Sequence, residues 1–102
     1  MGSHIVISKI TKFKNYVVKL TGYKFEKSNK NVLGLKYSFV LIKNNIRILG
    51  YDNHENKSPH IHRSNKEYPY NFTNIETTIN DFYKGVKKLI KNKSDVNGKD
   101  KD

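Results

Sequence analysis

The sequence contains no cysteine and no tryptophan, only two prolines, and fewer than half as many acidic as basic residues. Without cysteine the chain has neither a disulfide framework nor a thiolate metal site. No apolar run approaches the roughly 20 residues of a membrane-spanning helix. The first residues, Met1 to His4, lack the apolar core of a signal peptide. These absences favour a cytoplasmic protein that does not span a membrane, and His4 is not expected to be functional.

The excess of basic residues is the strongest compositional feature. The formal net charge is +11, from 20 Lys and Arg against 9 Asp and Glu. A surface of this charge attracts polyanions such as RNA or DNA. A membrane surface or an acidic protein partner fits the charge equally well, and a genome biased toward Lys, Asn and Ile would produce it without any function.

Four segments combine β-branched and aromatic residues in the alternation typical of strands. They are residues 5–11, 15–26, 35–43 and 46–53. The last two flank Asn44-Asn45, and Asn tolerates the positive φ of a tight hairpin turn. A two-residue turn pairs Lys43 with Ile46 and would place Tyr37 opposite Asp52.

Residues 54–71 show no periodicity and contain Pro59 and Pro69, which predicts an irregular loop. Long loops in compact domains are usually functional. After the loop, Thr73 and Glu76 have the spacing of a capping box. Apolar residues then recur at spacings of four and three, which predicts an amphipathic helix over residues 74–91.

The predicted fold class is therefore α+β. An antiparallel sheet of about four strands is covered by one C-terminal amphipathic helix, in a two-layer sandwich. Residues 1–92 are predicted to form a single domain, which suits a chain of 102 residues. Residues 93–102 are polar and are predicted to be a disordered tail.

The segment His60-Ile61-His62-Arg63 carries the chemistry of the predicted loop. In an extended segment the two imidazoles point to one side, and Ile61 points to the other as an anchor. Metal-free RNA cleavage needs a base, an acid and a cation beside the phosphorane. His60 and His62 are the candidates for base and acid, and Arg63 is the candidate cation. Asp52 is expected to orient one of the rings.

Two alternatives use the same residues. Asp52, His60 and His62 match a facial metal site, which would make the protein a metal-dependent nuclease. The loop also suits a non-catalytic module that binds nucleic acid or an acidic protein. The acid–base interpretation leads because the histidines, Asp52 and the positive charge occur together, and it requires no cofactor.

Further residues are candidates for contacts with RNA. Arg47 and Lys36 lie on the hairpin face opposite to Asp52 in the predicted register, and they are candidate phosphate contacts. Aromatic side chains just downstream are able to stack on unpaired bases, or to pack on the sheet instead. The complete set of RNA-binding candidates is Lys36, Arg47, Asn53, Tyr68 and Tyr70.

The residues also resemble a known family. Y-D-N at 51–53, P-H-I-H at 59–62 and E-Y-P-Y-N-F at 67–72 precede a helix of the I-x-x-x-I-x-x-F type. This order is similar to the TumE-type toxins of prokaryotic toxin–antitoxin modules, which carry R-Y-D-N followed by P-H-H-x-H. The resemblance spans residues 35–91.

The resemblance implies a growth-inhibiting toxin that cleaves RNA and has a small DNA-binding protein as its cognate antitoxin. A homodimer remains open. The matching positions are Asp52, Asn53, His60 and His62, with Tyr51 beside them. Two positions depart from the pattern: Gly50 stands where an arginine is common, and Ile61 replaces a histidine. The phosphate-binding arginine would then have to be Arg47 or Arg63.

Overall fold

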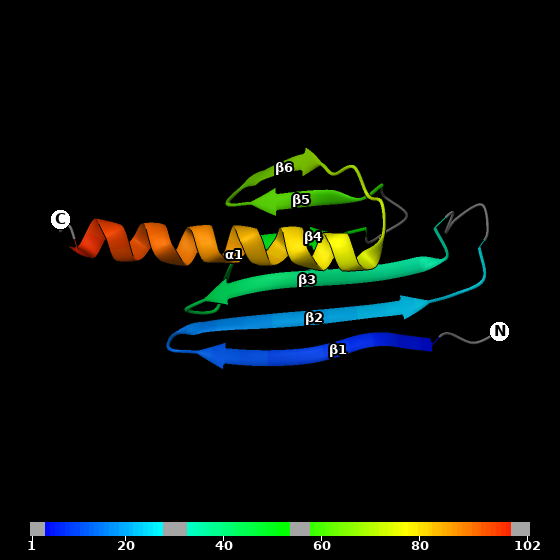
Figure 1. The fold of residues 1–102 in the computed structure, drawn as a ribbon, viewed down its shortest axis with the longest axis horizontal. Helices are drawn as coiled ribbons and strands as arrows, with labels where there is room; N and C mark the ends of the chain where they lie inside the picture. The colour runs from blue at the N-terminus through cyan, green and yellow to red at the C-terminus, as the bar shows by residue number, and fades with distance from the viewer. Residues whose placement is uncertain (1–3, 28–32, 54–57, 99–102) are drawn as a thin grey trace. The chain divides into compact units, whose positions relative to one another are not determined.

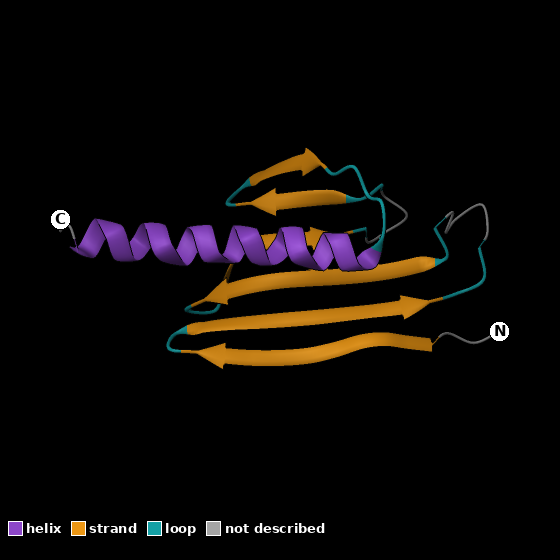
Figure 2. Ribbon diagram, viewed as in Figure 1, coloured by secondary structure: helices purple, strands orange, loops and turns teal. Residues whose placement is uncertain are grey.

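The computed structural model describes residues 4–27, 33–53 and 58–98, with side chains described to residue 91. Within these residues the chain forms six strands and one helix (Figures 1 and 2), which are β1 (His4–Phe13), β2 (Tyr16–Lys24), β3 (Leu35–Lys43), β4 (Ile46–Asp52), β5 (His60–Arg63), β6 (Lys66–Pro69) and α1 (Ile75–Gly98). The strands form one antiparallel sheet in chain order from β1 to β6. The predicted antiparallel sheet followed by a C-terminal helix is confirmed. In the described part of the chain, that helix is not long and apolar enough to cross a membrane.

Two of the six strands were not predicted. β5 and β6 lie where an irregular loop was expected, and they form a hairpin through a turn at Ser64, whose φ is 56°. Each strand has only four residues and lacks an apolar alternation, so the sequence pattern does not reveal it. Residues 60–63 form a strand because they pair with β4, and this pairing fixes the positions of His60 and His62.

The turn between β3 and β4 is as predicted. Asn44 and Asn45 both have positive φ, at 51° and 67°, and Lys43 pairs with Ile46. Farther along the hairpin the predicted register is wrong, because the register shifts next to Leu41. Asp52 consequently pairs with Ser38, and not with Tyr37.

This shift has a cause in the apolar pattern of β4. Ile48 and Leu49 are consecutive apolar residues, and a bulge at this point turns Leu49 and Tyr51 to the buried face of the sheet. Leu49 becomes fully buried opposite Leu41, while Ile46 stays 64% exposed. The bulge therefore places Asp52 on the polar face of the hairpin.

The buried face of the sheet is apolar and aromatic. Its members come from three strands and are all at most 8% exposed: Tyr16, Leu20, Leu35, Tyr37, Phe39, Leu41, Leu49 and Tyr51. The Tyr37 ring lies 5.1 Å from the Phe39 ring and 5.6 Å from the Phe72 ring, measured between centroids. Offset aromatic contacts of this kind add to the stability that burial provides.

The hydroxyl of Tyr37 is buried and has no hydrogen-bond partner among the described residues. Burial raises the pKa of this phenol above its ordinary value. Because an unsatisfied buried hydroxyl is costly, we expect Tyr37→Phe to raise the free energy of unfolding by about 1 kcal/mol. Urea denaturation of the two proteins measures this difference. A clear loss of stability would show that the hydroxyl is bonded in solution.

The helix α1 begins one residue later than the capping-box spacing predicts. Asn74 is the cap: its Oδ1 accepts the N–H of Thr77 at 2.8 Å, and its carbonyl accepts the Thr78 hydroxyl at 2.9 Å. Thr78, Phe82 and Val86 are buried, in agreement with an amphipathic helix.

At its other end, α1 continues to Gly98, past the predicted end at residue 91, because no proline or glycine interrupts the segment before Gly98. Residues 99–102 of the predicted tail lie outside the described residues. The packing of this helix on the sheet stays a prediction.

Candidate functional site

Asp52, His60 and His62 lie on one face of the sheet. Asp52 is the last residue of β4 and pairs with His60 of β5, while His62 pairs with Gly50. Directly opposed residues of antiparallel strands share a face. The shared face depends on the bulge in β4, because an unshifted register would have turned Asp52 toward the apolar core.

The side chains of these three residues converge. His60 Nε2 lies 2.8 Å from Asp52 Oδ1, and His62 Nε2 lies 3.8 Å from Asp52 Oδ2. The two imidazole rings are 4.7 Å apart and nearly perpendicular, at 84°. The structure thus brings together the three residues that the sequence predicted, around one carboxylate.

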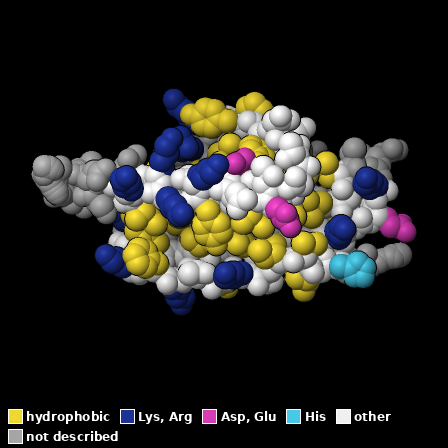
Figure 3. Space-filling view, viewed as in Figure 1, with side chains coloured by type: hydrophobic (Ala, Val, Ile, Leu, Met, Phe, Trp, Pro, Cys, Tyr) yellow, Lys and Arg dark blue, Asp and Glu magenta, His cyan; other side chains and the backbone are white. Residues whose placement is uncertain are grey.

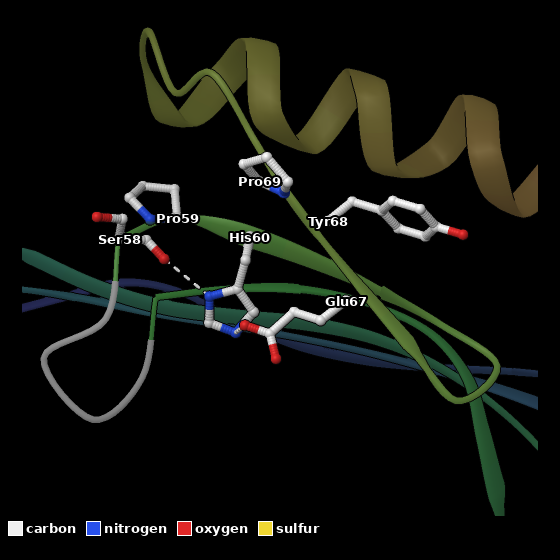
Figure 4. A pocket seen from close by; sticks show the side chains of 6 residues that line it. All are labelled: Ser58, Pro59, His60, Glu67, Tyr68 and Pro69. Carbon is white, nitrogen blue, oxygen red and sulfur yellow. Dashed lines mark hydrogen bonds and ion pairs between the residues drawn. The ribbon is translucent and has the colours of Figure 1, made fainter.

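His60 is held at both ring nitrogens. Its Nδ1 lies 2.8 Å from the carbonyl oxygen of Ser58, as the dashed line in Figure 4 shows. A carbonyl oxygen only accepts, so Nδ1 carries a hydrogen and Nε2 faces Asp52. His60 is 5% exposed. It is therefore a fixed group, and not one that moves freely toward a substrate.

A pocket lies beside His60. Its lining is Ser58, Pro59, His60, Glu67, Tyr68 and Pro69. Figure 4 shows the Glu67 carboxylate next to the His60 ring, and Glu67 Oε2 lies 3.8 Å from His60 Nε2. Neither Glu67 nor Ser58 was a candidate in the sequence, because their proximity depends on the unpredicted β5–β6 hairpin.

His62 is the more accessible histidine, with a side chain 21% exposed. Burial, and next the positive charge of Arg47, lower the pKa of His62 below its ordinary value of 6.5, against the opposing charge of Asp52. A lowered pKa favours the neutral ring near pH 7. The neutral ring offers a lone pair, which serves either a proton or a cation.

Two arginines were candidates for the cation of the site, and the structure separates them. Arg63 pairs with Leu49, so its side chain lies on the face opposite to His60 and His62. Arg47 pairs with Ile42, and the bulge puts it on the face of Asp52, contrary to the predicted register. Its charge acts on His62, and its Cδ lies 3.2 Å from where a Cβ on Gly50 would stand.

Asn53, a predicted RNA contact, instead forms hydrogen bonds with the backbone of β3. Its Oδ1 accepts the N–H of Tyr37 at 2.9 Å, and its Nδ2 donates to the carbonyl of Leu35 at 2.7 Å. Asn53 is 8% exposed. These bonds tie the end of β4 to β3 and thereby hold Asp52 in place.

Removal of this tie has a clear expected cost. Asn53→Ala leaves a buried N–H and a buried carbonyl without their partners, so we expect the free energy of unfolding to fall by about 3 kcal/mol. Thermal and urea unfolding measure the loss. Asn15→Ala is a suitable control because the Asn15 side-chain bond is exposed and long, at 3.5 Å. Equal stability of the two variants would contradict a bridging role for Asn53.

The remaining candidates are spread over both faces. Lys36 is exposed and lies two residues before Ser38, which puts it on the face of Asp52, contrary to the predicted register. Tyr70 packs edge-on against Tyr51 at 5.2 Å and donates its backbone N–H to Pro59, which fits packing on the sheet. Tyr68 is 44% exposed and its strand position pairs it with Ile61, on the face opposite to the histidines.

Positive charge extends beyond the cluster. Among the charged side chains that are visible in Figure 3, those of Lys and Arg are more frequent than those of Asp and Glu. The histidines and Asp52 therefore lie in a chain whose surface attracts anions.

The fold and the site together define a class of protein: a small basic α+β protein with a His–His–Asp cluster on one face of its sheet. The family model described as Toxin TumE matches residues 6–90, and the chain belongs to this toxin family. Membership implies a cognate antitoxin as a partner. No curated protein and no solved structure matches the chain.

Proposed function

We propose that this toxin cleaves single-stranded RNA by metal-independent acid–base catalysis, in which His62 is the base, Arg47 is the cation, and Asp52 and His60 are positioning residues. The observation that supports the proposal is the position of His62, the accessible imidazole: its ring faces the Asp52–His60 pair, and the Arg47 side chain lies beside Gly50, the residue that pairs with His62. A base beside a cation is what transesterification of a ribose phosphate requires.

The roles follow from accessibility. His62 Nε2 accepts the proton of the ribose 2′-hydroxyl while the 2′-oxygen attacks phosphorus. Arg47 stabilises the charge that develops on the phosphorane oxygens. The bond from phosphorus to the 5′-oxygen breaks, and water supplies the proton to that oxygen, because His60 is buried and bonded at both nitrogens. The products are a 2′,3′-cyclic phosphate and a 5′-hydroxyl end.

Other residues serve binding and position. Asp52 and His60 form a pair that fixes the carboxylate facing His62, and Asn53 anchors the strand that carries Asp52. Lys36 is proposed to contact phosphates along the same face. The proposed antitoxin is a small DNA-binding protein, and a homodimer stays a prediction.

Cleavage of a labelled single-stranded RNA in excess chelator tests the mechanism. We expect cleavage to continue, to leave cyclic phosphate ends, and to stop when the nucleotide 5′ to the cut lacks its 2′-hydroxyl. Intact RNA after long incubation would instead favour a binding module. Cleavage that stops in chelator and returns with a divalent cation would replace the acid–base mechanism with a metal-dependent one.

A further inference from the structure

We propose that Asp52, His60 and His62 bind one divalent transition-metal cation, with Zn²⁺ as the best fit, and that the bound cation inhibits RNA cleavage. Cation binding stands on the geometry alone. The inhibition rests on the proposed function, because it assumes that His62 acts as the base.

The spacing of the three side chains suits a single cation. One ligand atom from each residue lies within 4.8 Å of the other two. Ligands about 2.1 Å from a tetrahedral zinc ion are roughly 3.4 Å apart. The distances of 2.8 Å and 3.8 Å to the two Asp52 oxygens bracket that value. Small side-chain rotations are therefore sufficient to complete the geometry.

The hydrogen bond to Ser58 prepares His60 as a ligand. With the Nδ1 hydrogen given to the Ser58 carbonyl, the lone pair of a neutral ring lies on Nε2 and faces Asp52 Oδ1 at 2.8 Å. A lone pair that faces a carboxylate oxygen needs a proton or a cation between them. Histidine ligands of metals commonly donate their other ring N–H to a backbone carbonyl in this way.

The donor atoms indicate which cations fit. Two imidazole nitrogens and one carboxylate oxygen favour Zn²⁺ and its transition-metal neighbours over Mg²⁺ and Ca²⁺, which prefer oxygen ligands. Three protein ligands leave a fourth position open. Glu67 Oε2 is 3.8 Å from His60 Nε2 and is within reach of that position after a small movement.

Cation binding and base catalysis compete for one lone pair. A His62 Nε2 that is bound to a cation cannot accept the proton of the 2′-hydroxyl. Arg47 acts in the opposite sense, because its side chain lies beside Gly50, which pairs with His62, and a positive charge there weakens binding of a metal cation. Removal of Arg47 should therefore strengthen cation binding while it weakens cleavage, and a purely structural role would not produce this pair of effects.

Calorimetric titration of Zn²⁺ into chelator-treated protein, with a Co²⁺ absorption spectrum as a second readout, tests the site. We expect one strong site, weakened at least about tenfold in Asp52→Asn, His60→Gln and His62→Gln, and strengthened severalfold in Arg47→Ala. His4→Ala, a change of an exposed histidine on β1, is the matched control and should leave binding unchanged. Circular dichroism establishes that each variant is folded.

The absence of a strong site, or a site that all three ligand variants retain, would overturn the cation proposal. Inhibition is tested separately: cleavage should fall as Zn²⁺ rises, with the midpoint found by calorimetry, and chelator should restore it. Activation by Zn²⁺, with binding lost in the ligand variants, would overturn the inhibition and the metal-independent mechanism but leave the site supported. Binding without any effect on cleavage would also overturn the inhibition.

Discussion

Replacement of His62 by alanine is expected to lower kcat/KM for RNA cleavage about a thousandfold. The His62 ring is the accessible imidazole of the cluster, with Asp52 on one side and the charge of Arg47 acting on it from another. Alanine removes the only group in the described part of the chain that we propose as the base, while it leaves the Asp52–His60 pair intact. Initial rates on a short fluorescent RNA measure the effect.

Arg63→Ala is the matched control for this variant. Arg63 follows His62 directly in β5 and is exposed, but its side chain lies on the other face of the sheet. We expect its rate to stay within about twofold of the unaltered protein, since exposed residues outside a site have small effects. Equal losses of kcat/KM in His62→Ala and Arg63→Ala would show that the site is not confined to the face of the sheet that carries His62. A fully active His62→Ala protein would remove His62 as the base.

Much of the fold could be predicted because its signals are local. Asn44-Asn45 determines a turn by the backbone preferences of two residues, and the turn formed as predicted. The register beyond it could not be predicted in the same way. The bulge beside Leu41 is set by burial of Leu49 and Tyr51 in the sheet, and burial is a property of the assembled strands.

The site shows the same division between local and non-local signals. The i and i+2 spacing of His60 and His62 correctly places both rings on one face. The same alternation turns Arg63 to the other face, so the sequence held a signal against the Arg63 prediction. Arg47 and Asp52 share a face only because of the bulge in β4, and no local sequence pattern predicts that bulge.

Arg47 provides the second large expected effect, because Arg47→Ala should lower kcat/KM about a hundredfold. The loss should reside mainly in kcat, since the guanidinium is proposed to stabilise charge that is greatest in the transition state. Arg47→Lys should recover only part of the rate, because an ammonium lacks the planar donor arrangement of a guanidinium. Kinetic measurements over a range of RNA concentrations separate kcat from KM.

The position of Arg47 also predicts how its loss can be repaired. A Cβ on Gly50 would lie 3.2 Å from Arg47 Cδ but 3.6 Å from Val40 Cγ1, so Arg47 is the tight contact and Val40 is an ordinary one. Arg47→Ala opens the space beside Gly50, which pairs with His62. We therefore expect Arg47→Ala/Gly50→Arg to regain at least about tenfold over Arg47→Ala, because the donor returns to the same site. Gly50→Arg alone should not raise kcat/KM above that of the unaltered protein, because the side chains of Arg47 and the new arginine would compete for the same space. A double variant no faster than Arg47→Ala would show that the charge of Arg47 is not what the site requires.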